Sequence, residues 1–312
     1  MMDWTDRHFR FFARLLSKQA LLYTEMVTTG ALLHGDQARF LNHEPAEQPL
    51  ALQLGGSVPA ELARCARLGE AAGYAEINLN AGCPSDRVQN NMIGACLMAH
   101  PERVADCIKA MRDATSLEIT VKHRIGINGR DSYTELCDFV GQLQEAGCQT
   151  FIVHARIAIL EGLSPKQNRE IPPLRHEVAA QLKQDFPDLE LILNGGLKTL
   201  EDCQKQLGVF DGVMVGREAY QNSYMLAYVD QLLFDPDSPV ISRHAALLAL
   251  RPYIVRHLAA GGALHHMTRH LLGLAHGFPG ARRFRQLLSA DIHQSSSPLA
   301  LLDQATELLT GY

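Results

Sequence analysis

Short apolar runs alternate with amphipathic segments between residues 20 and 217. The apolar runs are continuous rather than alternating, which is typical of strands buried on both faces in a parallel sheet. They predict strands at 21–27, 50–54, 76–79, 118–122, 151–154, 189–193 and 212–215. The amphipathic segments, several with a capping side chain or proline at the first turn and glycine after the last, predict helices at 5–17, 59–72, 101–115, 133–146 and 200–207. This alternation predicts an α/β fold.

Polar residues follow almost every predicted strand, and this distribution separates two α/β architectures. A doubly wound sheet concentrates glycine in one early strand-to-helix turn, whereas a (β/α)8 TIM barrel gathers functional residues at the carboxyl ends of many strands. The second pattern holds here, so the sequence favours the barrel. A barrel needs eight strands and seven are predicted. We therefore expect the first strand, upstream of 5–17, to be truncated or missing through a late start of the reading frame; a different fold is the less favoured alternative.

The pattern changes after residue 217. The segment 235–239, Asp-Pro-Asp-Ser-Pro, has turn chemistry and is a candidate linker. Helical spacing follows at 242–260, 264–276, 281–288 and 298–309. We therefore predict two domains, a barrel at 1–235 and a small all-helical C-terminal domain at 236–312.

Composition narrows the class of protein. The 312 residues are 46% apolar and 20% charged, which is typical of a globular chain rather than a disordered one. No apolar run is long enough to predict a membrane span, and the charged N-terminus contains no signal-peptide core. The seven cysteines form no C-x-x-C pair, which argues against disulfides and a metal site and favours a reducing, cytoplasmic compartment.

The net charge of −5 is unevenly distributed along the chain. Residues 236–312 contain seven Arg, no Lys and four acids, a net charge of +3 that leaves −8 for the remainder. A basic tail beside an acidic body indicates an anionic partner for the tail, although a solvated helical face explains the same charges equally well. Arg282 and Arg285 lie three positions apart on one predicted helix, where they could hold a nucleic-acid backbone or balance the helix ends.

Two glycine-bearing strand ends form a candidate phosphate site. Asn194-Gly195-Gly196 follows the strand at 189–193, and Gly216-Arg217 follows the strand at 212–215. In barrels, the loops after the last two strands often bind phosphate through backbone N–H groups, and Arg217 adds a positive charge. The combination favours a phosphate-bearing ligand over two tight turns.

Four further residues near strand ends carry candidate chemistry. Lys122 could stabilise an anionic cofactor ring or an enolate, or pair with an acid. His154 is more often structural than catalytic at such a position, and Gln53 could contact a planar ring or cap a neighbouring backbone group. Cys83, just past the strand at 76–79, could act as a general acid or a nucleophile, or be a small residue in a tight loop.

Long motifs extend over nearly the whole chain. They lie at 3–7 (Asp-Trp-Thr-Asp-Arg), 23–30, 53–56, 76–98 around Cys83, Lys122, 154–156, 163–174, 194–196, 212–217 and 269–285. In these motifs the sequence resembles the tRNA-dihydrouridine synthases, and specifically their A-type bacterial branch.

The resemblance implies an FMN-binding TIM-barrel catalytic domain followed by a helical tRNA-binding domain. It implies that NADPH reduces FMN, that hydride passes to C6 of a D-loop uridine at positions 20 and 20a, and that a cysteine protonates C5. Carried over by motif, Cys83 is the proton donor. The residues that the resemblance assigns to FMN are Met1, Met2, Gln53, Lys122, His154, Asn194, Gly195, Gly196, Gly216 and Arg217. Those it assigns to tRNA are Asn80, Lys166, Arg169, Arg282 and Arg285.

The chain departs from the family's pattern in three places. Only Met1-Met2 remain of the strand end that precedes the motif at 3–7, His123 follows Lys122 where a small or uncharged residue is usual, and Ile157 stands where relatives often carry a polar or basic residue. Two other functions stay open at this stage. One is an FMN barrel oxidoreductase that acts on a small molecule, and the other is a non-catalytic tRNA-binding or folding factor.

Overall fold

The computed structural model describes residues 1–85, 92–293 and 297–310, which belong to two compact units. Unit 1 contains Met1–Leu22, His43–Gln48 and Gly216–Tyr312, and unit 2 contains Tyr23–Asn42 and Pro49–Val215. The N-terminal segment is thus grouped with the C-terminal helices. The predicted division into domains at 1–235 and 236–312 stays a prediction.

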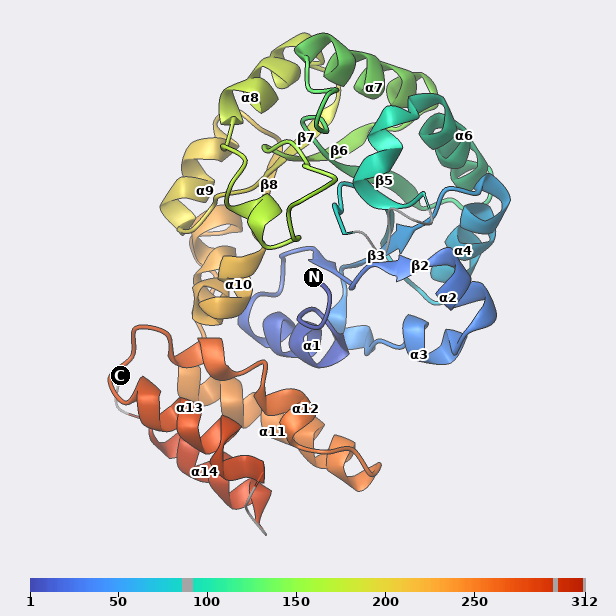
Figure 1. Ribbon diagram of the computed structural model, residues 1–312. Helices are drawn as coiled ribbons and strands as arrows, with labels where there is room; N and C mark the ends of the chain where they lie inside the picture. Colours follow the sequence, from blue (N-terminus) through green and yellow to red (C-terminus); the bar gives the residue numbers. More distant parts are fainter. Residues whose placement is uncertain (86–91, 294–296, 311–312) are drawn as a thin grey trace. The chain divides into compact units, whose positions relative to one another are not determined.

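Unit 2 is built on a curled parallel sheet (Figure 1). The strand order is β1-β3-β4-β5-β6-β7-β8, with β2 pairing beside β3, and every pair from β2 to β8 is parallel. The strands are β1 (Leu22–Tyr23), β2 (Val27–Thr28), β3 (Leu50–Gly55), β4 (Glu76–Ala81), β5 (Glu118–Arg124), β6 (Thr150–His154), β7 (Glu190–Asn194) and β8 (Gly212–Met214). No pair of described strands joins β8 to β1 or β2, so the curled sheet is open there. The sequential order confirms the predicted (β/α) barrel architecture.

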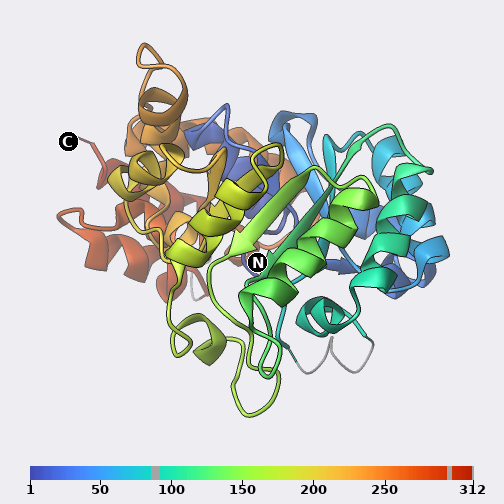
Figure 2. The same ribbon diagram turned by 90° about the horizontal axis from the view of Figure 1, so that it is seen from above.

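Helices cover the outer face of this sheet, and Figure 2 shows them running alongside the strands. They are α2 (Thr29–His34), α3 (Gln37–Leu41), α4 (Pro59–Ala71), α6 (Pro101–Arg112), α7 (Tyr133–Glu145), α8 (His176–Asp185) and α9 (Leu200–Leu207), with the 3-10 turns η2 (Gly94–Ala99) and η3 (Gln167–Arg169). The predicted helices at 59–72, 101–115, 133–146 and 200–207 are confirmed within a few residues. Ser132 starts α7 through a capping box with Glu135, as its sequence pattern predicts.

Close packing between α4 and the sheet depends on one glycine. A Cβ at Gly69 would lie 2.5 Å from Ile77 Cδ1 and 2.9 Å from Leu52 Cδ2. Leu52 and Ile77 are fully buried on β3 and β4. The absence of a side chain at Gly69 therefore lets α4 lie directly on the two strands that carry Gln53 and Asn78.

The predicted strand at 21–27 is wrong in one respect, because the structure divides it into β1 and β2. The division falls at Thr24. Its backbone N–H donates to the Ala51 carbonyl at 3.0 Å, but its hydroxyl, rather than a backbone carbonyl, accepts from the Gln53 N–H at 3.0 Å. The Thr24 hydroxyl thus replaces a backbone carbonyl as the acceptor in the hydrogen-bond ladder, and this replacement interrupts the strand.

Unit 1 consists of helices and short helical turns (Figure 1). They are α1 (Arg7–Leu16), α10 (Arg217–Gln221), α11 (Arg243–Ala259), α12 (His265–Thr268), α13 (Ala281–Ser289) and α14 (Pro298–Glu307), with η1 (Pro45–Glu47), η4 (Ser223–Tyr228), η5 (Asp230–Phe234), η6 (Leu272–Ala275) and η7 (Asp291–His293). The predicted helix at 264–276 is wrong in its continuity, because α12 and η6 divide it. The break falls at residues 269–271. Within η6, Gly273 lies so close to the Tyr220 carbonyl that a Cβ would be 2.3 Å from the oxygen.

Within unit 1, Asp6 joins the N-terminal motif to the motif at 269–285. Its carboxylate caps α1 and also accepts from Arg269 Nη2 at 2.7 Å and from His270 Nε2 at 3.0 Å. Burial opposes ionisation of Asp6, but the hydrogen bond and charge of His270 outweigh it and hold the pKa of Asp6 below its ordinary value. His270 Nδ1 lies 2.9 Å from the Tyr220 hydroxyl, and the Trp4 ring stacks on Tyr220. Two motifs, at 3–7 and 269–285, therefore meet with Tyr220 of α10 in one network.

Among the described residues, no helix is long and apolar enough to cross a membrane.

His123 gives unit 2 a testable dependence on pH. Its Nδ1 donates to the Arg124 carbonyl at 2.7 Å, its Nε2 has no hydrogen-bond partner among the described residues, and its ring packs on Phe139 and Phe151. Burial lowers the pKa of His123 to about 4, and the charge of Lys122 adds to this effect. Between pH 4 and 6.5 the unfolded chain binds a proton that the folded chain does not, so stability falls as the pH falls through this window.

We expect this effect to be measurable by urea unfolding of the wild type and of His123→Gln. Lowering the pH from 6.5 to 5 should cost the wild type about 2 kcal/mol more than the variant, since each pH unit in the window is worth about 1.4 kcal/mol. Equal losses in the two proteins would contradict the assignment. A difference of opposite sign would contradict it as well.

Candidate active site

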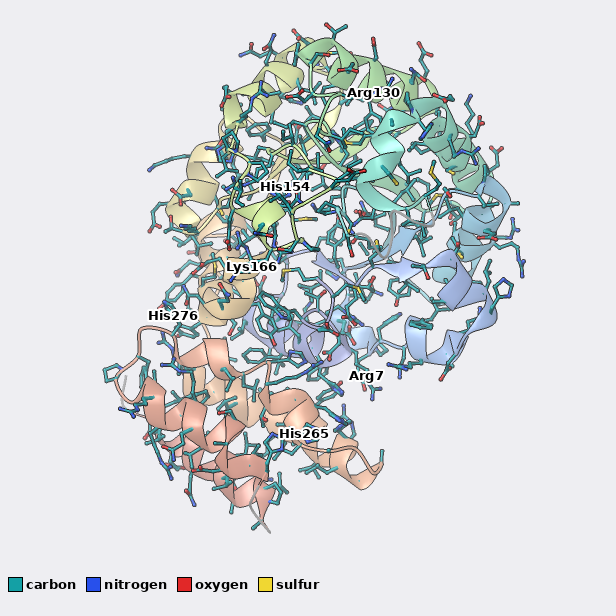
Figure 3. The ribbon with its side chains drawn as sticks, in the orientation of Figure 1. Arg7, Arg130, His154, Lys166, His265 and His276 are labelled. Atoms are coloured by element: carbon teal, nitrogen blue, oxygen red, sulfur yellow. The ribbon has the colours of Figure 1, made fainter. Side chains whose placement is uncertain are left out.

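The carboxyl ends of the strands of unit 2 bring most of the predicted side chains to one edge of the sheet, because neighbouring parallel strands end together. The register places Asn80 opposite Lys122 and His154 opposite Asn194. Figure 3 labels His154, at the end of β6, and Lys166, in the loop that follows. The residues that sequence analysis took from separate strands are therefore neighbours in space.

Two buried carboxamides connect a predicted flavin contact to the loop that carries Cys83. Asn80 Nδ2 donates to Gln53 Oε1 at 2.9 Å, and Asn80 Oδ1 accepts from the backbone N–H groups of Gly82 and Cys83 at 3.0 Å each. Gln53 and Asn80 are 8% and 9% exposed. Because both side chains are enclosed, the position of the Cys83 loop depends on Asn80.

The Cys83 loop is also held from its other side. The Ala95 N–H donates to the Cys83 carbonyl at 2.9 Å, and Gly94 lies so close that a Cβ would be 2.4 Å from that oxygen. Gly94 has φ +83°, which a residue with a side chain rarely adopts. Cys83 is partly exposed, and its backbone is held from both sides of the loop.

The other described cysteines have different surroundings. Four are buried, and burial raises their pKa values to about 12 for Cys65, Cys107 and Cys148 and about 11 for Cys203. Cys96 and Cys137 are partly exposed but lie in η2 and α7. Among the seven thiols, Cys83 alone directly follows a strand of the sheet and faces its polar edge, which agrees with the role predicted from its motif.

Lys122 is hydrogen-bonded to a neutral side chain at the edge of the sheet. Its Nζ donates to Asn194 Oδ1 at 3.0 Å, and Asn194 in turn donates to the Met214 carbonyl at 2.7 Å. Burial lowers the pKa of Lys122 to about 7, and the charge of Arg124 lowers it further, while Cys83 acts in the opposite direction. An anion placed beside this amine would restore its full charge at neutral pH. The environment of Lys122 therefore suits an anionic ligand.

The turn after β7 has two backbone donors available. Gly195 (φ +109°) and Gly196 (φ +76°) adopt conformations that favour glycine, and no acceptor is found for either N–H among the described residues. A Cβ at Gly195 would lie 2.6 Å from His154 Cδ2, and one at Gly196 would lie 2.3 Å from Leu174 Cδ1. Side chains thus crowd one face of the turn, while its N–H groups stay available for an anion.

His176, at the start of α8, fixes the orientation of this turn. Its Nε2 lies 2.8 Å from the Gly195 carbonyl and acts as the donor. In a planar trans peptide the C=O and the following N–H point in opposite directions. The bond from His176 therefore fixes the direction of the Gly196 N–H. No sequence pattern indicated this residue, because it lies on a helix rather than at a strand end.

His154 is held in its neutral form. Its pKa lies well below the ordinary value, first because of burial and then because of the charges of Arg124 and Lys122. The neutral imidazole carries one N–H and one lone pair, so it can serve as a donor or an acceptor to a ring placed at this edge. It is not a permanent cation in a phosphate site.

Arg124 joins the loop after β4 to the loop after β6 through three backbone carbonyls. Its Nε donates to the Gly82 carbonyl at 3.2 Å, and its Nη1 donates to the carbonyls of Ile157 at 3.1 Å and Asn168 at 3.0 Å. Arg124 is 2% exposed. Sequence analysis did not select it, although it stands two residues after Lys122 on the same face of β5, which the period of a strand could have indicated.

The loop after β6 carries two of the predicted tRNA contacts, and Asn168 organises it. The fully buried Asn168 side chain accepts from the Ile159 N–H at 2.8 Å and donates to the Ile159 and Leu163 carbonyls. Lys166 is exposed on this framework and Arg169 is half-buried. In Figure 2 this loop and η2 project on the same side of the sheet. The two cations thus stand on an ordered loop.

The remaining predicted contacts lie in unit 1. Gly216 and Met1 are close to each other, since a Cβ at Gly216 would be 3.7 Å from Met1 Sδ. Met2 is exposed, and Arg217 begins α10. Arg282 and Arg285 are both exposed on α13, on the side opposite its buried residue Phe284. The roles assigned to all these residues stay predictions.

No group of His, Cys, Asp and Glu in the described residues could hold a metal ion.

Comparisons with known proteins agree with one another. The family model described as dihydrouridine synthase matches residues 1–309. A protein of Pseudomonas putida named tRNA-dihydrouridine(20/20a) synthase is 75% identical over 311 residues, covering 100% of this chain and 93% of that protein. Proteins with the same name from Pseudomonas aeruginosa and Salmonella typhi are 73% and 56% identical, covering 100% and 99% of this chain and 94% and 93% of the relatives.

We expect the arrangement around Arg124 to require its guanidinium. Arg124→Lys keeps the charge but cannot reach three carbonyls, and each buried carbonyl left without a donor costs about 1–3 kcal/mol. The variant should lose about 2–4 kcal/mol in urea unfolding. The matched control is Arg112→Lys, at an exposed arginine that donates to one carbonyl, that of Ala146. A similar stability loss in the two variants would show that the three-way contact is unimportant.

Proposed function

Because this chain belongs to the dihydrouridine synthase family, we propose that it is an FMN-dependent enzyme that reduces uridine to 5,6-dihydrouridine in tRNA. The uridines at positions 20 and 20a are the proposed targets, since the names of the relatives carry these positions. NADPH is the proposed source of electrons, and the cytoplasm, where tRNA is modified, is the expected compartment. The observation that carries the proposal is the joint presence of Cys83, Lys122 and the Asn194-Gly195-Gly196 turn at one edge of the sheet.

The residues present fit FMN. The available N–H groups of Gly195 and Gly196 suit a phosphate, and Lys122 suits a ring that becomes anionic when reduced. Gln53 and His154 are proposed to supply polar contacts to the ring. The family's motifs also assign Met1, Met2, Gly216 and Arg217 to FMN, and we propose these contacts on that ground alone. When bound, reduced FMN supplies the hydride for C6 of uridine.

The chain's own residues supply the proton and the orientation of the substrate. Cys83 donates the proton to C5 as its S–H bond breaks, and a new C–H bond forms there. Asn80 holds the Cys83 loop and is proposed to contact the target uridine. Lys166 and Arg169 are proposed to bind tRNA phosphates beside the site, and Arg282 and Arg285 bind them on the helical unit. The uridine must leave its stack to reach the thiol, which costs a few kcal/mol.

Cys83→Ala tests the proposed chemistry. We expect the variant to bind FMN like the wild type and to lose about 10²–10⁴ in rate, because no other group protonates C5. The readout is the two-hydrogen mass gain of nucleosides from an unmodified tRNA transcript. Cys96→Ala is the matched control, since it removes another partly exposed thiol. Full activity of Cys83→Ala would refute the assigned proton donor.

The same assay separates the alternative functions. Reduction of free uridine or of an unrelated small molecule, without action on tRNA, would favour a small-molecule oxidoreductase. A purified chain that binds tRNA but shows no flavin absorbance would favour a non-catalytic tRNA-binding or folding factor. Transcripts with cytidine at position 20 or 20a would show which of the two uridines is used.

His176→Phe tests the phosphate-binding turn. Loss of the donor to Gly195 frees the peptide that carries the Gly196 N–H, so we expect a Kd for FMN about 10-fold higher, equivalent to about 1.4 kcal/mol. Riboflavin, which lacks the phosphate, should bind the variant and the wild type alike. The neighbouring change Glu177→Gln is the control. An equal loss of affinity for both flavins would place the effect at the ring instead of the phosphate.

A further inference from the structure

A chain of buried side chains runs from the amino end of β4 to the Cys83 loop. At its lower end, Glu76 Oε1 accepts from the Thr120 hydroxyl at 2.6 Å and from the Tyr23 hydroxyl at 2.8 Å. Thr120 Oγ1 accepts from Asn78 Nδ2 at 2.7 Å, and Asn78 Oδ1 accepts from Gln53 Nε2 at 2.8 Å. Gln53 is then joined to Asn80, and Asn80 to the loop, as described above. Glu76, Asn78 and Asn80 alternate along one face of β4.

Every bond in this chain points in the same direction. The Thr120 hydroxyl donates its single hydrogen to Glu76, so towards Asn78 it can only accept. Asn78 must therefore turn its nitrogen to Thr120 and its oxygen to Gln53, and Gln53 must turn its oxygen to Asn80. At the upper end the Gly82 and Cys83 N–H groups can only donate, which requires the same orientation of Asn80. The Thr120–Glu76 bond at one end and the backbone N–H groups at the other end require the same orientations. Each amide in the chain therefore has one permitted orientation.

The common direction of these hydrogen bonds determines which donors and acceptors Gln53 and Asn80 keep available for a ligand. Asn80 Oδ1 already accepts hydrogen bonds from two N–H groups, and Asn80 Nδ2 donates one of its two hydrogens to Gln53. The capacity left on Asn80 is its second N–H, which suits a carbonyl of a ligand and not an amino group. Gln53 likewise keeps one hydrogen on Nε2 after donating to Asn78.

We propose that Glu76, at the amino end of β4, and Thr120, opposite Asn78 on β5, are positioning residues: through Asn78 they fix the amide orientations of Gln53 and Asn80 and with them the place of the Cys83 loop. The proposal rests on the proposed function, because Gln53 is assigned to the flavin and Asn80 to the uridine. Thr120 and Asn78 are fully buried. Removal of the Thr120 hydroxyl leaves Asn78 Nδ2 without an acceptor. An amide flip that satisfies Asn78 would then set donor against donor at the next link.

The neighbouring strands provide a matched control. Thr150, on β6, donates from its hydroxyl to Glu118 and also lies 3.1 Å from Glu190 Oε2, at the amino ends of β5 and β7. It is a buried threonine bonded to carboxylates, as Thr120 is, but its hydroxyl bonds to Glu118 and Glu190 instead of to Asn78, Gln53 or Asn80. Thr150→Val therefore imposes the same chemical change without touching the chain of amides.

The experiment compares three variants, Thr120→Val, Thr120→Ser and Thr150→Val, with the wild type. Each protein is studied both as the holoenzyme and after removal of the flavin. Three quantities are measured: the Kd for FMN, the kcat with saturating tRNA, and the rate at which iodoacetamide alkylates Cys83, followed by peptide mass spectrometry. For Thr120→Val we expect a Kd about 10-fold higher and a kcat at least 10-fold lower, equivalent to about 1.4 kcal/mol each. The Cys83 alkylation rate should change in the flavin-free protein as well. Thr120→Ser, which restores the hydroxyl, and Thr150→Val should stay within about 3-fold of the wild type.

Each other outcome overturns the proposal. If Thr120→Val and Thr150→Val behave alike in all three measurements, the hydroxyl of Thr120 has no special connection to the site. If Thr120→Val does not fold while Thr120→Ser and Thr150→Val do, the role of Thr120 is structural. If the wild type binds no FMN and reduces no tRNA uridine, the proposed function fails and the inference fails with it. A fully active wild type with an unaffected Thr120→Val defeats the inference alone.

Discussion

The polar interior of the sheet must satisfy its hydrogen bonds within the protein, and the site depends on this constraint. A buried amide without a partner costs about 1–3 kcal/mol, so carboxamides on the inner face of β3 and β4 are tolerated only as a complete chain. The carboxyl group of Glu76 at one end and the backbone N–H groups of the Cys83 loop at the other end complete it. The hydrogen bonds that satisfy the buried amides thus also fix the orientation of the side chains at the carboxyl edge of the sheet.

A second constraint is electrostatic. Lys122, Arg124, His154 and Arg169 are near one another at the carboxyl edge, and their mutual repulsion and burial lower the pKa values of Lys122, Arg124 and His154. A cluster of this kind is costly without negative charge, and carbonyl oxygens supply only part of it, as they do around Arg124. The two ligands proposed above, FMN through its phosphate and tRNA through its backbone, are both anionic. The positive charge at this edge therefore suits both proposed ligands.

Sequence patterns predict the strands and most of the helices because continuous apolar runs, capping residues and helix-ending glycines are local signals. They also select Cys83, Lys122, His154 and the glycine turn as candidates, because each lies near the carboxyl end of a strand. They miss Arg124, His176 and Thr120, whose roles arise from contacts across 42, 19 and 44 residues of the chain. The division of the strand at 21–27 has the same origin, since Thr24 bonds to β3 through its side chain. Hydrogen bonds between residues so far apart in the chain leave no local signal in the sequence. The period of two along β5 could have placed Arg124 on the same face as Lys122, but it could not have predicted the carbonyls that Arg124 binds.

The strand β4 contributes both to the stability of the sheet and to the candidate site. Residues 76, 78 and 80 of β4 point inward by the period of two, while Ile77 and Leu79 between them are fully buried in the outer layer. A shift of register by one residue would place the carboxamides among the helices and the leucine and isoleucine in the interior, so the apolar face enforces the register that the polar face needs. The packing of α4 against Ile77 through Gly69 is then part of the positioning of Cys83. A change in the outer layer should reach the thiol through the register of β4, without any contact with the site.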